Sequence, residues 1–356
     1  MDYRFPTRRR SRSLWLATII LSLVSPVLAS SATSQPAVVR TALVIATGPT
    51  GGTYFPVGEA IASIISHPPG VYRCEKAGVC GPSGLIASVR TSPGAISNVI
   101  AVNAGRVDAA LAQSDVVADA LGAKGAFRHE GMQSHVRLLA NLFPEEVHII
   151  AAAGAHIRSV SDLRGKRVSI GAPASGTIVT ARAVLAAYGI PIRKIKANAD
   201  PADGAAEKLA KGRLDAMFFV GGAPVPFIRE LLANGKAVLV PISGKARERL
   251  LRRSAALSVR TIPAGVYPRS GKIDTVAVQA VFIVSDSIPD ATAYAIAKSL
   301  FNPANRNALA GSHRSAQAIR LQNAAAISPL LLHPGARRFY VEAGVLPKMD
   351  EHAVHK

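Results

Sequence analysis

The amino-acid sequence predicts an α/β fold of two doubly wound lobes, because one structural unit occurs in it twice. Each copy has an apolar run, a glycine loop, a helical pattern and the segment Gly-Arg-Val/Leu-Asp-Ala, followed by a second apolar run. That segment occupies residues 105–109 and 212–216. Apolar strands alternating with helices are typical of mostly parallel sheets that helices cover on both faces. We expect the Arg and Asp of the segment to be helix-end and turn residues, because ligands bind at the opposite ends of such strands.

Apolar periodicity and N-cap residues define the elements of the first copy. Apolar residues recur at helical spacing from Val57 to Ile65, and Pro56 suits the first turn of that helix. Thr53 and Ser114 stand at positions where a hydroxyl can accept a backbone N–H. The expected elements are a strand at 42–46, a helix capped by Thr53 that stops at 68–70, a helix from 93 to 105, a strand at 109–112 and a helix at 116–121 capped by Ser114.

The second copy repeats this order and is followed by a C-terminal segment. Thr177 is the expected cap of its first long helix, which ends at Gly189. The other expected elements are a strand at 147–153, a helical turn at 161–166, a strand at 167–170, a helix at 205–211, a strand at 217–220, a helix at 226–232, a strand at 276–284 and helices at 290–301 and 334–343.

The spacing of the repeated motifs locates an insertion and predicts the lobes. Thr53 and Gly105 lie 52 residues apart, whereas Thr177 and Gly212 lie 35 apart, so the first copy carries 17 extra residues. We assign these to a hairpin at 71–91. Lobe one is expected at 40–153 plus 266–356, and lobe two at 154–265. The chain then crosses between the lobes twice, and these two segments can act as a hinge.

The N-terminal residues predict export. Residues 1–29 combine five arginines, an apolar stretch at 14–28 and Val-Leu-Ala at 27–29, which is typical of a cleavable signal peptide. An uncleaved anchor is the alternative. In an oxidising compartment we expect Cys74 and Cys80 to form a disulfide, with two free buried thiols as the other interpretation. We therefore expect a periplasmic protein.

The charge balance restricts the partners. The formal net charge is +20, and the chain after residue 29 still carries +16. No metal module, aromatic-studded basic strand or recognition helix accompanies this charge, so we expect no nucleic-acid partner. A membrane surface, an anionic solute or a transporter with acidic loops fits better. The densest basic run, residues 245–253, is interpreted as a solvated helix face.

Enzyme and metal chemistry find little support in the sequence. Neither His-Glu-x-x-His nor Gly-x-Ser-x-Gly occurs, and the nine histidines are scattered. His148 lies in an apolar run and is interpreted as a core histidine. Glu145 and Glu146 follow Pro144 and are interpreted as a solvated turn. We therefore expect no catalytic residues, no cofactor and no metal.

Glycine loops at helix starts are the expected binding elements. Backbone N–H groups and the helix dipole there favour carboxylate or phosphate. Residues 50–53, 174–177 and 221–224 form three such loops, although short strand-to-helix turns need glycine without any ligand. Residues 113–115 stand where a strand meets a helix, so they either face a cleft or cap the helix.

Taken in order, these motifs resemble the TAXI-family solute-binding receptors of TRAP (tripartite ATP-independent periplasmic) transporters. The resemblance covers about residues 40–345 and departs from the family where Ala95 replaces the serine of Thr-Gly-Gly-Ser-x-x-Asn. The motifs are Thr-Gly-Pro-Thr-Gly-Gly-Thr-Tyr-Phe-Pro (47–56), Gln-Ser-Asp (113–115), Val-Ser-Asp-Leu-Arg-Gly-Lys-Arg-Val (160–168), Gly-Ala-Pro-Ala-Ser-Gly-Thr (171–177), Thr-Ile-Pro-Ala-Gly (261–265) and His-Pro-Gly-Ala (333–336). We interpret the last as a helix-start packing motif.

The resemblance implies a two-lobed periplasmic binding protein, type II-like, that is monomeric. It would capture a small carboxylate-bearing ligand, either an amino acid such as glutamate or glutamine or a dicarboxylate, and deliver it to TRAP-type permease subunits by transient docking. An exported sensor or an enzyme on the same scaffold remains the alternative. The ligand-binding residues implied are Gly51, Gly52, Thr53, Tyr54, Gln113, Ser114, Asp115, Ser175, Gly176, Thr177, Gly221, Gly222 and Pro224.

Overall fold

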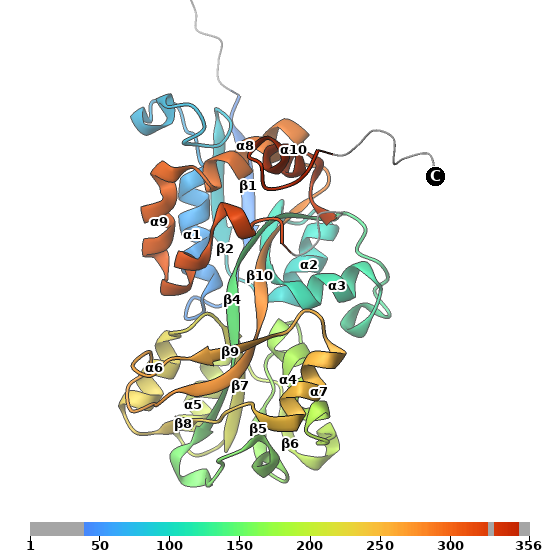
Figure 1. Cartoon of the computed structure of the whole chain (residues 1–356), viewed down its shortest axis with the longest axis vertical. Helices are drawn as coiled ribbons and strands as arrows, with labels where there is room; N and C mark the ends of the chain where they lie inside the picture. The colour runs from blue at the N-terminus through green and yellow to red at the C-terminus, as the bar shows by residue number, and fades with distance from the viewer. Residues whose placement is uncertain (1–38, 327–330, 349–356) are drawn as a thin grey trace, which may run out of the picture. The chain divides into compact units, whose positions relative to one another are not determined.

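The computed structural model describes residues 39–326 and 331–348, which form one compact unit around a ten-stranded sheet (Figure 1). The proposed signal peptide lies outside the described residues. The strands are β1 (Thr41–Ala46), β2 (Leu85–Arg90), β3 (Ala109–Gln113), β4 (Val136–Ala152), β5 (Arg167–Ser169), β6 (Lys196–Asn198), β7 (Ala216–Gly221), β8 (Ala237–Leu239), β9 (Ser258–Ile262) and β10 (Ile273–Ser285).

The sheet has two parallel ends and an antiparallel centre. Its order is β2-β1-β3-β10-β4-β7-β5-β6, with β8 added to β4 and β9 added to β10. Strand β1 pairs in parallel with β2 and β3, and β5 does so with β6 and β7. Long antiparallel strands β4 and β10 join these ends. We name β1–β3 with their helices the first sheet half, and β5–β7 with theirs the second sheet half.

Helices flank both sheet halves. In Figure 1, α1 and α9 lie on one side of β4 and β10 while α2 and α3 lie on the other, and α5 and α6 oppose α4 and α7 in the same way. The helices are α1 (Tyr54–Ile65), α2 (Ala95–Asn103), α3 (Ser114–Leu121), α4 (Gly176–Ala187), α5 (Ala202–Ala210), α6 (Pro226–Ala233), α7 (Gly244–Arg253), α8 (Asp290–Leu300), α9 (Arg306–Ser312) and α10 (Pro334–Glu342). Every residue of β3 and β7 is buried, as expected for strands covered on both faces.

The repeated segment has the same structural role in both copies. In the first copy the backbone N–H of Val44 donates to Asp108 Oδ2 at 2.7 Å, and in the second the N–H of Arg167 donates to Asp215 Oδ2 at 2.7 Å. Each aspartate therefore ties the turn before one strand to the neighbouring parallel strand. The arginines of the two segments are exposed. The prediction that these are turn and helix-end residues is confirmed.

The insertion of the first copy is not the hairpin that we predicted. Residues Tyr72–Glu75 form a 3-10 turn, and Leu85–Arg90 form β2, which pairs in parallel with β1. The alternating Leu85–Arg90 segment extends the sheet edge instead of folding back on its own chain. The Cys74–Cys80 disulfide is present and joins the 3-10 turn to the loop that follows it, with a Cα–Cα distance of 5.2 Å.

Three predicted helix caps are also wrong in their side-chain contacts. Thr53 occupies the N-cap position of α1, but its Oγ1 donates to the carbonyl of Gly222 at 3.3 Å. Ser114 begins α3 and its Oγ accepts the N–H of Gln279 at 3.4 Å. Thr177 lies inside α4, and its Oγ1 accepts the N–H of Val220 at 3.3 Å. These hydroxyls bond to residues distant in sequence, so they connect elements and do not cap their own helices.

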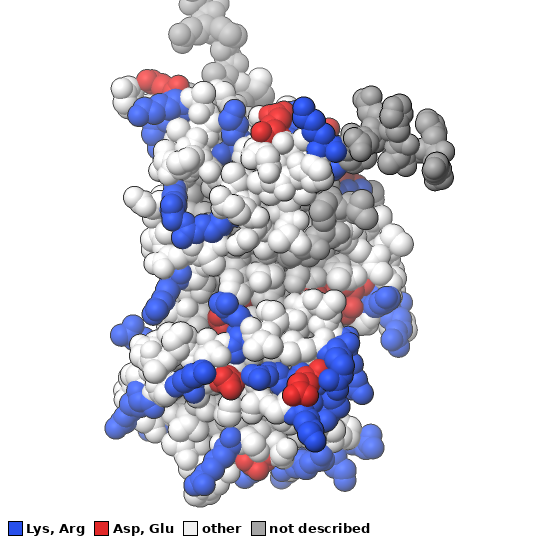
Figure 2. Space-filling model, in the orientation of Figure 1, with Lys and Arg blue, Asp and Glu red and all other residues white. Residues whose placement is uncertain are grey.

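The basic run confirms its prediction. Residues Gly244–Arg253 form α7, in which Ala246 and Leu250 are buried while Lys245, Arg249, Arg252 and Arg253 are exposed. Figure 2 shows this group of basic side chains over the second sheet half. Within the described ranges, none of the helices has the length and apolar character needed to cross a bilayer.

Candidate functional site

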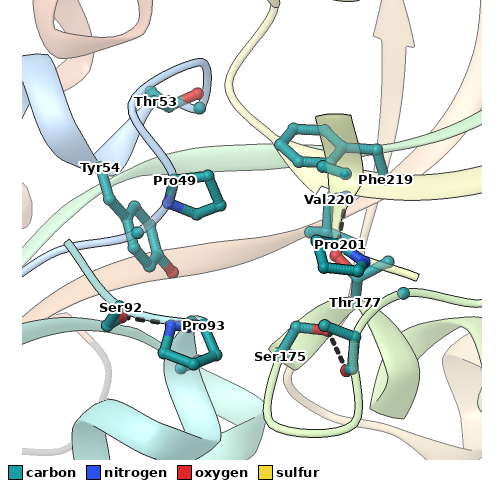
Figure 3. A pocket seen from close by; sticks show the side chains of 18 of the residues that line it. Pro49, Thr53, Tyr54, Ser92, Pro93, Ser175, Thr177, Pro201, Phe219 and Val220 are labelled. Carbon is teal, nitrogen blue, oxygen red and sulfur yellow. Dashed lines mark hydrogen bonds between the residues drawn. The ribbon is translucent and has the colours of Figure 1, made fainter. Parts of the chain in front are cut away.

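One cavity of about 610 Å³ lies between the two sheet halves. In Figure 3, Pro49, Tyr54 and Pro93 face Pro201, Phe219 and Val220 across it. Its lining residues are Gly48, Pro49, Thr50, Gly52, Thr53, Tyr54, residues 91–95, Gln113 and Glu145 from the first half and β4, and Gly171, Ala172, Ser175, Gly176, Thr177, residues 200–203, Ala205 and residues 218–220 from the second.

Two helix N-termini border the cavity. Tyr54 begins α1, and Gly176 begins α4. The first N–H groups of a helix have no partner within the helix, and the helix dipole makes this end partly positive. Glycine at the start of α4 permits a close approach of the two halves: a Cβ on Gly176 would lie 1.7 Å from Gln113 Oε1. Both ends can therefore receive a negatively charged group.

The two halves touch each other around the cavity. The N–H of Ser97 donates to the carbonyl of Ala174 at 3.1 Å, and Thr53 bonds to Gly222. A Cβ on Gly94, whose φ is +129°, would lie 3.1 Å from the Cα of Ser175. Ala95, at the position of the family serine, is buried beside these loops. These contacts close the cavity in this structure.

Glu145 and Tyr54 form the polar centre of the cavity wall. The hydroxyl of Tyr54 donates to Glu145 Oε2 at 2.7 Å, and the Glu145 residue is 2% exposed. Burial raises the pKa of Glu145 well above its usual range; the Tyr54 hydrogen bond opposes this, and the neighbouring acids Asp115 and Glu146 add to it. Burial, and then Glu145, raise the pKa of Tyr54. The pair therefore places a carboxyl group in a site with little water.

Our interpretation of residues 145–146 as a solvated turn is wrong. Pro144 does not end the strand: β4 carries one extra residue opposite β10 between Asn141 and Pro144, and this bulge accommodates the proline. Glu145 consequently enters the sheet and faces the cavity. Glu146 is buried too, and its carboxylate accepts the N–H of Ala223 at 3.1 Å and pairs with Arg260 at 3.5 Å.

Asp115 lies behind the cavity wall. It accepts the N–H of Val116 at 2.8 Å and the hydroxyl of Thr180, from the second half, at 3.4 Å. Burial raises its pKa to about 6. Asp115 therefore adds negative potential near Glu145 whenever it is ionised.

His148 and His333 occupy structural positions, as predicted. His148 is buried, its Nε2 lies 2.9 Å from the Tyr267 hydroxyl, and burial lowers its pKa to about 4. His333 is the N-cap of α10, where its Nδ1 accepts the N–H of Gly335 at 3.2 Å. In the part of the chain that the structure describes, no three His, Cys, Asp or Glu side chains are grouped to hold a metal ion.

The predicted site residues fall into two groups. Those lining the cavity are Gly52, Thr53, Tyr54, Gln113, Ser175, Gly176 and Thr177; those outside the lining are Gly51, Ser114, Asp115, Gly221, Gly222 and Pro224. The loop of the last three packs against the first half instead: Ser315 Oγ donates to the carbonyl of Ala223 at 3.2 Å, and His313 Nε2 lies 3.0 Å from that of Pro224.

Sequence reasoning missed several residues of the cavity wall. Glu145, Asp200 and Phe219 come from β4, the loop before α5 and β7, none of which matched a glycine-loop motif. For Glu145 a signal exists, because paired carboxylates inside a long apolar run are costly to bury without a function. Asp200 and Phe219 carried no comparable signal.

The fold is that of the two-lobed periplasmic binding proteins, as predicted. A solved structure described as a periplasmic transporter matches with a TM-score of 0.50 at 13% identity, covering 78% of this chain and 98% of that one. The alkanesulfonate-binding protein SsuA from Xanthomonas axonopodis pv. citri, bound to MOPS, has a TM-score of 0.45 at 15% identity, with 87% and 96% covered. The aliphatic sulphonate binding protein SsuA from Escherichia coli has 0.44 at 16%, with 87% and 95% covered.

The sequence itself defines the family. A model of the NMT1-like family matches residues 45–344. The chain belongs to the NMT1-like family.

Proposed function

We propose that the protein is an extracytoplasmic solute receptor, which captures a small carboxylate-bearing solute and passes it to a membrane permease. The observation that carries this proposal is the cavity of about 610 Å³ whose wall comes from both sheet halves. Its volume suits a small organic molecule, and such clefts between lobes are common ligand sites. The membership in the NMT1-like family and the fold agree with a binding role.

The solute's carboxylate would bind at the start of α4. The N–H groups of Gly176 and Thr177, the side chain of Ser175 and the first turn of α1 surround one region of the cavity. The dipole of a twelve-residue helix adds to these hydrogen bonds. Tyr54 would pack on the carbon skeleton of the solute. Binding then excludes water from the cavity, which strengthens each of these polar contacts.

Opening would occur between the lobes, residues 40–153 plus 266–356 and residues 154–265. The two long strands β4 and β10 pass between the sheet halves, so small changes along them would suffice as a hinge. The Ser97–Ala174 and Thr53–Gly222 hydrogen bonds must break when the cavity opens. A solute that contacts both halves stabilises the closed form because it binds that form better.

For the partner we propose the permease subunits of a TRAP-type transporter in the periplasm, since the ordered loop motifs resemble the receptors of that class. The fold alone does not select the permease. The proposal is tested by transport of the bound solute into vesicles that contain a TRAP permease. Uptake driven by an ion gradient supports it; uptake that requires ATP contradicts it.

The receptor function itself is tested by a solute screen. Thermal-shift and native mass spectrometry of the purified protein with amino acids, amines, dicarboxylates and sulfonates should find at least one solute that binds one per chain and raises the melting temperature. The expected stabilisation follows the ratio of solute concentration to Kd, about 2.7 kcal/mol at a hundredfold excess over Kd. Failure of the whole screen at millimolar concentrations would overturn the receptor proposal.

A further inference from the structure

We infer that the solute carries a positively charged nitrogen that lies against Glu145, and that it has no more than one carboxylate. The class is therefore an α-amino acid without an acidic side chain, rather than a dicarboxylate or a sulfonate. This inference rests on the proposed receptor function and names the chemistry of its ligand.

The charges around the cavity are the first argument. Among the described residues that line it, none is Lys or Arg, whereas Glu145, Asp200 and Asp203 are acidic. The chain as a whole has 42 Lys and Arg against 22 Asp and Glu, so the cavity has the opposite bias to the protein. Lys208, which is not part of the lining, pairs with Asp200. A second carboxylate on the solute would find neutral donors and repelling acids, but no cationic side chain, among the described residues of the lining.

The position of Glu145 is the second argument. Its Oε2 is occupied by the Tyr54 hydroxyl, while no hydrogen bond to its Oε1 is present among the described residues, and the residue lines the cavity. The charged groups that act on it are Asp115 and Glu146, both acidic, and the basic Arg260 pairs with Glu146 instead. Without a counter-ion a buried carboxyl group favours its protonated form, so a cation beside it stabilises the ionised form. An ammonium group on the solute supplies the missing counter-ion and a donor for Oε1.

Gln113 provides an independent polar site on the same wall. It is 3% exposed, lines the cavity, and its Oε1 has no hydrogen-bond partner. Gln113 Oε1 lies against Gly176, so this acceptor stands beside the N–H groups at the start of α4. Because the ammonium and the carboxylate of an α-amino acid are carried by the same carbon atom, an acceptor beside N–H donors suits such a zwitterion.

The experiment compares solutes with and without a free ammonium group and with one or two acidic groups. L-glutamine, N-acetyl-L-glutamine, L-glutamate, succinate and methanesulfonate, with the other neutral amino acids and their N-acetyl derivatives, are tested by thermal shift and calorimetry on the wild-type protein. We expect stabilisation only by solutes with a free ammonium group and no acidic side chain. N-acetylation should remove binding, because it converts the charged ammonium group into a neutral amide and adds the bulk of an acetyl group.

The residue itself is tested by Glu145→Gln, which can still accept the Tyr54 hydroxyl. We expect it to weaken the best solute at least tenfold, whereas Glu59→Gln, an exposed position on α1, should not change the affinity. A solute without a cationic nitrogen that binds the wild type, or unchanged affinity in a folded Glu145→Gln variant, would overturn the inference while leaving the receptor function intact. If no solute of any class binds, both proposals fail.

Discussion

The two copies of the repeated unit agree in their turns and differ in the residues that face the cavity. Asp108 and Asp215 make the same backbone hydrogen bond at the same length. By the spacing of the repeats, however, Tyr54 of the first copy corresponds to Ile178 of the second, and Gln113 corresponds to Val220. At these two pairs of equivalent positions the first half supplies a polar side chain and the second half an apolar one.

This difference shows which positions carry the fold and which carry the function. The aspartates fix strand-to-strand connections that any such unit needs, so they are the same in both copies. The cavity needs two chemically distinct walls, because a small solute has a polar end and an apolar surface. The predictions below separate these roles by changing equivalent positions in the two copies.

The largest effect is expected from the glycines at the two helix starts. Replacing both Gly52 and Gly176 by Val should abolish the solute-induced thermal shift. Of the single changes, Gly176→Val should account for most of the loss, since its Cβ would lie 1.7 Å from Gln113 Oε1, against 3.3 Å from the Pro49 carbonyl for Gly52. Gly154→Val, a position with open space, is the control. Unchanged shifts in the double variant would refute the site.

The next largest effect concerns Asp115, whose counterpart in the second copy is Gly222. With a folded-state pKa of about 6 against an ordinary value of 3.8, Asp115 keeps a proton in the folded protein that the unfolded chain has released. Stability therefore falls as the pH rises from about 4 to 6, by roughly 1 to 3 kcal/mol. Asp115→Asn should remove this contribution and stabilise the protein at pH 8.

The measurement is urea unfolding of the wild type and Asp115→Asn at pH 4, 6 and 8. His148 has the opposite effect on the pH dependence of stability. Its pKa is lowered from an ordinary value of 6.5 to about 4, so its contribution makes stability fall as the pH drops from about 6.5 to about 4. It is present in both proteins, so the difference between them isolates Asp115. A difference that does not grow with pH would show that Asp115 is not the group responsible.

The repeated aspartates should both contribute to stability and be irrelevant to binding, and Asp215 should contribute somewhat more because it also pairs with the Arg167 side chain at 2.6 Å. Asp108→Ala and Asp215→Ala each leave a backbone N–H without its acceptor, and each should lower the free energy of unfolding by about 1 to 2 kcal/mol. Calorimetric titration with the best solute should give the wild-type affinity for both variants. A loss of affinity confined to one of them would break the equivalence of the two copies.

The smallest effect distinguishes Thr53 from Thr177. Thr53 bonds across the cavity to the second half, whereas Thr177 bonds to Val220 within its own half. Thr53→Val should weaken solute affinity severalfold with little change in unfolding, and Thr177→Val should lower the unfolding free energy by about 1 kcal/mol. The two variants are compared by calorimetry and chemical denaturation. The reverse pattern would contradict the assignment of the closing contact.

Much of the fold was predictable because it depends on local patterns. The apolar runs at β3 and β7, the helix starts at Pro226 and Pro334 and the turns at the repeated aspartates follow from periodicity and residue type. The pairing of β2 with β1 could not be read from the chain, because it depends on which edge of the sheet is free.

The candidate site was predictable only where a loop motif reaches the cavity. Gly52, Tyr54 and Gly176 lie in such loops and line it. Glu145 does not lie in such a loop. It reaches the cavity wall because a bulge lets β4 continue past Pro144. Asp200 reaches the cavity from the loop before α5, and only the tertiary fold determines that position.

The central claim is that one small solute contacts both sheet halves at once. Hydrogen–deuterium exchange of the wild-type protein, with and without the solute that stabilises it most, tests this directly. We predict protection of peptides covering residues 50–56 and of peptides covering residues 171–180 in the same experiment, with no change in α7. Protection of only one of the two loops, or of neither, would contradict the account.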